Sequence, residues 1–146
     1  MIQILKIFFL LLILISVFST CKKDSSQSDV PNVQVDFYIY LSEPSNINLN
    51  SLNMGVYFAQ GVKGIVVSKT GPETFVALER NCTYQPSSSS AVVSIDTSGT
   101  SFLKDASCGS RFYLSDGSVD HGPATVPLKQ YHTFYNASNS TVHVYN

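Results

Sequence analysis

Residues 33–41, Val33-Gln-Val-Asp-Phe-Tyr-Ile-Tyr-Leu41, carry an apolar side chain at every second position. Successive side chains of a β-strand point to opposite faces, so this period of two predicts a strand with one buried face. The positions expected on that face are Val33, Val35, Phe37, Ile39 and Leu41. We expect a folded domain to begin at this strand and to extend over residues 33–146.

The remainder of that domain contains further short strand patterns separated by clusters of Gly, Pro, Ser and Asn, and no helical periodicity. Such a series predicts an all-β fold, a small antiparallel sandwich or partly open barrel. Residues 136–140 are expected to turn the last hairpin. The predicted strands are residues 55–59, 64–68, 74–79, 91–95, 101–103, 111–114, 129–134 and 141–145.

Composition narrows the function classes. The chain has 146 residues, a formal net charge of -1 and only 13% charged residues. This length allows one domain with one core, and the lack of a basic surface argues against nucleic acid as a partner. The sequence contains no recognisable Ser-His-Asp order, paired-carboxylate motif or phosphate-binding glycine loop of the kind found in enzymes. We interpret Asp120-His121 as a polar turn.

The chain begins with the pattern of a secretory signal over residues 1–20. Lys6 precedes an apolar run, residues 7–18, and small residues close it. The run is shorter than the roughly 20 apolar residues that a membrane-spanning helix needs. Residues 21–32 are polar and without periodicity, which predicts a flexible tether between leader and domain.

Ser19-Thr20-Cys21 resembles a bacterial lipobox, in which a cysteine becomes the lipidated N-terminus. The resemblance implies lipidation of Cys21 and an exported protein anchored in a membrane, at its periplasmic face or at the cell surface. Lys22-Lys23-Asp24 is similar to the charged tag of surface lipoproteins in Bacteroidetes. The alternative is an ordinary signal peptide with a chance cysteine.

Residues 108–131 resemble the second half of a Rieske iron–sulfur domain. The matching motifs are Gly109-Ser-Arg-Phe112, Asp116-Gly117, Gly122-Pro-Ala124 and Pro127-Leu-Lys-Gln-Tyr131, in the order and spacing of that family. Residues 74–84 resemble the strand that leads into the family's first ligand box. The resemblance implies a Rieske-like domain whose two ligand loops meet at one tip.

The ligand positions themselves are degenerate. A Rieske cluster needs two thiolates on one iron and two imidazoles on the other. The resemblance places Cys82 at the first cysteine, Tyr84 at the first histidine, Asp105 at the second cysteine and Cys108 at the second histidine. We therefore expect no metal and no cofactor, although phenolate and carboxylate can bind iron, which keeps an atypical [2Fe-2S] cluster as the alternative. The histidines of the chain, His121, His132 and His143, lie beyond the second box.

Cys82 and Cys108 have a second interpretation as a disulfide. Beyond a secretion signal the compartment is oxidising, and closing this loop would stabilise the fold by about 3 kcal/mol on the chain-entropy model. A mononuclear metal site is a third interpretation, which the sequence favours least because two widely spaced cysteines without histidine make a poor zinc site.

Two function classes follow. The first is a cluster-free envelope lipoprotein that acts as a binding or structural module for an unknown protein or glycan. Tyr38, Tyr40, Tyr57 and Tyr113 are candidates for an exposed aromatic binding surface. The second is an electron carrier, an oxidoreductase component with a [2Fe-2S] cluster on unusual ligands.

Overall fold

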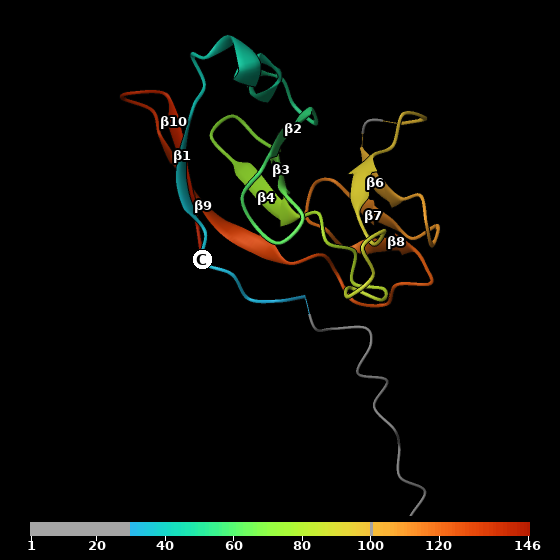
Figure 1. The fold of residues 1–146 in the computed structure, drawn as a ribbon. Helices are drawn as coiled ribbons and strands as arrows, with labels where there is room; N and C mark the ends of the chain where they lie inside the picture. The colour runs from blue at the N-terminus through green and yellow to red at the C-terminus, as the bar shows by residue number, and fades with distance from the viewer. Residues whose placement is uncertain (1–29, 100) are drawn as a thin grey trace, which may run out of the picture.

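The protein is described by a computed structural model over residues 30–99 and 101–146 (Figure 1). The ten strands within these residues form two antiparallel sheets, which confirms the predicted all-β class. The larger sheet contains β1 (Asp36–Tyr40), β2 (Gly55–Phe58), β3 (Ile65–Lys69), β4 (Phe75–Glu79), β9 (Gln130–Asn136) and β10 (Thr141–Tyr145). The smaller sheet contains β5 (Val93–Ile95), β6 (Phe102–Asp105), β7 (Arg111–Tyr113) and β8 (Val119–His121).

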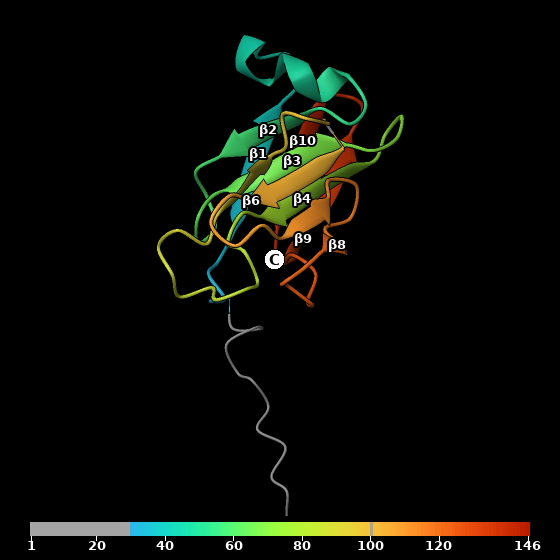
Figure 2. The same ribbon diagram turned by 90° about the vertical axis from the view of Figure 1, so that its right-hand side faces the viewer.

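The larger sheet has the strand order β1-β10-β9-β4-β3-β2 and curls into a partly open barrel. The smaller sheet, in the order β5-β6-β7-β8, is inserted into the chain between β4 and β9. It lies over β3 and β4, on the side away from β1 and β10 (Figures 1 and 2). The inserted sheet therefore covers one face of the barrel wall.

Strands β3 and β4 are buried on both faces, which explains their almost continuous apolar sequences. Val67 and Ala77 belong to the core inside the barrel. Val66 and Leu78 belong to a second core between the barrel wall and the inserted sheet. The two strands are thus the shared wall of both hydrophobic cores.

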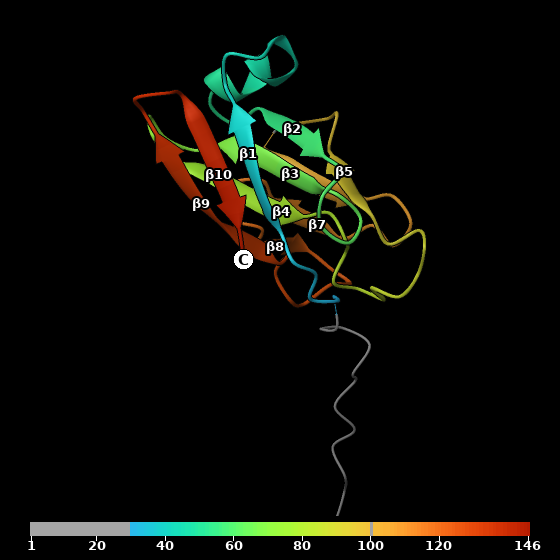
Figure 3. The same ribbon diagram turned by 60° about the vertical axis from the view of Figure 1, so that its left-hand side comes forward.

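Strand β1 shows the alternation that the sequence predicts. Val35, Ile39 and Leu41 are buried in the barrel core, with Phe37 packed partly against it. Tyr38 is exposed on the opposite face. Figure 3 shows β9, β10 and β1 side by side, with β1 paired only to β10.

Two local predictions were wrong. A 3₁₀-helix, η2 (Pro44–Asn50), follows β1 where no helix was expected. This helix has seven residues, begins at a proline and buries only Asn46 and Leu49. A helix this short shows no repeating apolar pattern in the sequence. Asp120-His121 lies in β8 rather than in a turn. No helix among the described residues is long and apolar enough to cross a membrane.

Glu79, the last residue of β4, is fully buried and ties three segments together. Its carboxylate accepts hydrogen bonds from the backbone N–H groups of Val62 (2.8 Å), Lys63 (2.9 Å) and Asn81 (3.0 Å). The hydroxyl of Tyr131 in β9 donates the fourth, at 2.8 Å. Four donors satisfy an acceptor-only carboxylate, so burying this group carries no unpaired oxygen.

We expect Glu79→Gln to lower the free energy of unfolding by about 1–3 kcal/mol, because an amide N–H₂ would face donors where an oxygen now accepts. Urea unfolding followed by circular dichroism measures the change. Glu73→Gln is the matched control, since Glu73 is exposed in the turn before β4. Equal midpoints for the two variants would show that the buried network contributes nothing to stability.

Candidate functional site

Two loops that are distant in sequence meet at one end of the inserted sheet. Cys82 follows β4, and its backbone N–H donates to the carbonyl of Ala91 at 3.0 Å. Asp105 ends β6, and Cys108 lies in the turn between β6 and β7. The ligand atoms of Cys82, Asp105 and Cys108 all lie within 4.8 Å of one another. The structure thus brings together three of the four residues that the resemblance selected.

Asp105 organises the second loop. Its Oδ1 accepts hydrogen bonds from the backbone N–H groups of Ser107 (2.7 Å) and Cys108 (3.3 Å). Gly109 continues the turn with a φ of 83°, a left-handed conformation that glycine adopts without strain. The other oxygen, Oδ2, is buried and makes no hydrogen bond. A buried carboxylate oxygen without a partner is costly, and Oδ2 shares this condition with both side-chain polar atoms of Asn81, the buried residue before Cys82.

The two cysteines have different environments. Cys82 is fully buried, whereas Cys108 is half-buried. Burial raises the pKa of the Cys82 thiol well above its usual range, and the nearby Asp105 carboxylate and Cys108 raise it further, against a lowering by the Tyr84 backbone N–H. The Cys82 thiol is therefore protonated at neutral pH when it binds nothing.

The sulfur atoms of Cys82 and Cys108 are 3.9 Å apart as free thiols. A disulfide would need them at about 2.05 Å, so the predicted bond requires a small closure of the loops and stays a prediction. The Cys108 sulfur also lies 3.1 Å from the hydroxyl oxygen of Ser110. Tyr84 is half-buried and packs against the core under the inserted sheet.

A third segment, residues 122–128, holds the two loops from the side. Ser110 Oγ accepts a hydrogen bond from the backbone N–H of Ala124 at 2.9 Å. The hydroxyl of Thr83 donates to the carbonyl of Val126 at 2.6 Å. Both cysteine loops are therefore fixed to the same neighbouring segment.

The described residues do not fit a [2Fe-2S] cluster of the Rieske type. That cluster needs two imidazoles, and no histidine joins the group of three ligands among the residues described. His121 lines a shallow hollow beside Arg111, His132 packs against Tyr145, and His143 forms an ion pair with Asp36. In addition, the resemblance assigns Cys82 and Cys108 to different irons, yet their sulfurs are close enough to share one ion.

Sequence reasoning missed the residue that fixes the first loop. The ammonium group of Lys63 donates to the backbone carbonyls of Pro86 (3.2 Å), Ser88 and Ala91 (3.1 Å). A single lysine between two glycines gives no sequence signal for this role, because its partners lie 23 to 28 residues further along the chain. Lys63 therefore acts as a structural cation of the site.

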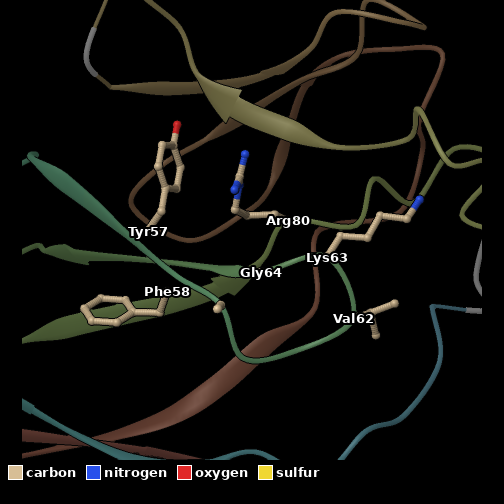
Figure 4. Close-up of a pocket in the computed structure, with 7 residues that line it drawn as sticks. Tyr57, Phe58, Val62, Lys63, Gly64 and Arg80 are labelled. Carbon is tan, nitrogen blue, oxygen red and sulfur yellow. The ribbon is translucent and has the colours of Figure 1, made fainter.

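The open hollow next to Lys63 is lined by the end of β2, the β2–β3 loop and Arg80, which follows β4 (Figure 4). It encloses about 380 Å³. Arg80 donates from Nε to the carbonyl of Val93 at 3.0 Å and lies 4.0 Å above the ring of Tyr57. The Tyr57 hydroxyl accepts from the backbone N–H of Ile95 at 2.6 Å. Figure 4 shows the Lys63 amine pointing away from Arg80, so the two cations do not converge on a ligand.

The four tyrosines expected to form one surface do not do so. Tyr57 bridges the two sheets, and Tyr113 packs on Phe102 in the inserted sheet. Tyr38 and Tyr40 instead share the outer face of β1 with side chains of β9 and β10. Strand register sets Tyr38 opposite His143, and His143 opposite Phe134. We name this surface the aromatic face, and its residues are Tyr38, Tyr40, His132, Phe134, His143 and Tyr145.

Four rings of the aromatic face contact one another, those of Tyr38, His143, Tyr145 and His132. The Tyr38 and His143 rings are nearly parallel, with centroids 4.2 Å apart, and Tyr145 lies 4.7 Å beyond His143. The imidazole of His143 also bonds to Asp36 at 2.7 Å. The alternating pattern of β1 was the sequence signal that could place Tyr38 and Tyr40 on one exposed face. The rings that β9 and β10 add to this face could not be predicted, because they depend on the order of the strands in the sheet.

The predicted lipidation site, Cys21, lies outside the described residues, as do the leader and most of the tether. Comparison with protein-family models and with curated proteins found no match to this chain.

In the reduced protein we expect iodoacetamide to alkylate Cys108 at least about ten times faster than Cys82, because Cys82 is fully buried and its raised pKa keeps the thiol protonated. Peptide mapping by mass spectrometry at neutral pH follows the two residues separately, and denaturant should release Cys82 for reaction. Cys108→Ser is the control, in which Cys82 should remain slow. Equal rates in the native protein would contradict the burial of Cys82.

Proposed function

We propose that the protein is an exported, membrane-anchored lipoprotein whose Rieske-like domain holds no [2Fe-2S] cluster and acts as a binding module of the cell envelope. The single observation that carries this proposal is the misfit of the ligand set at the tip. One carboxylate, one phenol and two cysteines replace the two-cysteine, two-histidine set, and the histidines lie elsewhere among the described residues.

The Rieske-like part of the proposal rests on the motifs of residues 74–84 and 108–131 and is supported by the course of the chain. The segments that carry Cys82 and Cys108 are separated by 26 residues and nevertheless meet at one tip. A small sheet inserted between two strands of a curled larger sheet is what holds them there. The lipoprotein part rests on the leader pattern and on Cys21.

The binding role is supported by the aromatic face. Exposed apolar side chains scattered singly are normal, but a contiguous group of rings on one sheet face is typical of an interaction site. Tyr38, Tyr40 and Phe134 are each more than half exposed. Asp36 and the imidazoles of His132 and His143 add hydrogen-bonding groups among the rings, which suits a protein or glycan partner.

The first test is metal and sulfide analysis of the full chain, purified anaerobically from membranes in mild detergent. We expect a colourless protein with no acid-labile sulfide, since the ligand set lacks both imidazoles. A near-stoichiometric pair of irons with visible absorption would overturn the proposal and establish an electron carrier with unusual ligands. Circular dichroism of the same sample verifies that the protein is folded.

The second test addresses the aromatic face. We expect Tyr38→Ser with Phe134→Ser to weaken binding to soluble polysaccharides or cross-linked envelope proteins at least about tenfold, since aromatic anchors dominate such interfaces. Affinity electrophoresis and in-cell photo-crosslinking measure the two partner classes separately. Ile47→Ser is the matched control, because Ile47 is 61% exposed, like Tyr38 (59%) and Phe134 (60%), but lies on η2. Binding that survives the double variant would place the partner elsewhere.

A further inference from the structure

The group of Cys82, Asp105 and Cys108 contains a buried oxygen that its surroundings do not explain. Asp105 Oδ1 is used by the turn, whereas the buried Oδ2 has no nitrogen or oxygen donor. A carboxylate oxygen of Asp105 lies within 4.8 Å of both sulfurs, and the Cys82 thiol is the hydrogen-bonding group beside the carboxylate. A thiol is only a weak donor, so neither cysteine replaces the lost hydration of a carboxylate oxygen. A disulfide between the cysteines would leave the same oxygen unpartnered. A positively charged ion bound by both sulfurs and by the carboxylate would provide the partner that this oxygen lacks.

The sulfur separation matches such a partner. Two thiolates bound to one tetrahedral ion with metal–sulfur bonds of about 2.3 Å lie about 3.8 Å apart. Cys82 Sγ and Cys108 Sγ are 3.9 Å apart, and Asp105 completes a set whose ligand atoms all lie within 4.8 Å. Small changes of side-chain rotamer bring such a group around one ion. The two cysteines are far apart in the sequence, which argued against zinc, but the fold brings their loops together, so this objection no longer applies.

Donors around the sulfurs are arranged to support thiolates. With Cys108 as a thiol, its Sγ donates to Ser110 Oγ at 3.1 Å, and the same oxygen accepts from the backbone N–H of Ala124. Once Cys108 loses its proton, the Ser110 hydroxyl is the group that can turn and donate to the thiolate. The Ser110 backbone N–H points at the same sulfur from 3.5 Å, and the Tyr84 backbone N–H bonds to Cys82. Outer donors of this kind orient metal ligands and offset their charge.

We propose that Cys82, Asp105 and Cys108 bind a single tetrahedral divalent ion of the zinc class, at the tip that would hold a cluster in a Rieske domain. This inference deepens the proposed function. It rests on that function in one respect, because a [2Fe-2S] cluster on the same residues would leave no place for a single ion. On binding, the two thiols release their protons to solvent, two thiolates and one carboxylate bind the ion, and a water takes the fourth position. The ion then cross-links the two loops.

The test is cobalt titration of the full chain, purified anaerobically in detergent with a reductant and freed of metal. We expect one Co²⁺ per chain, with sulfur-to-cobalt charge-transfer absorption and the visible bands of a tetrahedral ion, and displacement by Zn²⁺. Asp105→Asn should weaken binding at least about tenfold while keeping Oδ1 for the turn. Cys108→Ser should reduce the charge-transfer intensity, since one thiolate is lost.

Asp116→Asn is the matched control, because Asp116 accepts from Ser118 in the same kind of turn but has no cysteine beside it. It should bind cobalt as the wild type does. Absence of charge transfer, or equal affinity in Asp105→Asn, would overturn the metal site. So would a complete Cys82 to Cys108 disulfide in protein isolated without reductant. Stoichiometric iron and sulfide would instead overturn the proposed function.

Discussion

The buried carboxylate of Glu79 is the interaction on which the tip depends. Its four hydrogen bonds join the β2–β3 loop, the end of β4 and β9 at one point. Lys63, held there by its backbone, reaches across to the carbonyls of Pro86 and Ala91 and fixes the loop that follows Cys82. Burial and the neighbouring Glu79 carboxylate also raise the pKa of the Tyr131 hydroxyl, which keeps it a donor at neutral pH. The position of the first cysteine loop is therefore set by a polar network in the barrel together with the Thr83–Val126 hydrogen bond at the tip.

The double burial of β3 and β4 supplies the second constraint. Since Val66 and Leu78 face the inserted sheet while Val67 and Ala77 face the barrel, neither strand can shift register by one residue without exchanging its two apolar sets between cores. The inserted sheet in turn packs Leu103 and Phe112 against that wall. Asp105 and Cys108 follow directly from these strands, so the second loop is positioned by apolar packing. The site lies where a polar network and an apolar core meet.

The sequence allowed prediction of features that depend on local pattern. The alternation around Phe37 predicted β1 and its buried face, and the cluster at residues 136–140 predicted the last turn. Local pattern could not predict the burial of Glu79 or the role of Lys63, because their partners come from other strands. It also could not assemble the aromatic face, which depends on β10 lying between β1 and β9. The proximity of Cys82 and Cys108 followed from the Rieske resemblance and not from their spacing.

The chemistry of the tip is decided by Asp105 more than by the cysteines. Two thiols 3.9 Å apart are compatible with a disulfide or with a shared ion, and an oxidising compartment favours the first. A disulfide, however, would leave a buried carboxylate oxygen unsatisfied beside a neutral bridge, which is an unfavourable environment for an ionised group. Oδ1 alone meets the needs of the turn, and an asparagine side chain would supply that acceptor equally well. The proposed ion, shared with the two sulfurs, would supply a positive charge beside this carboxylate.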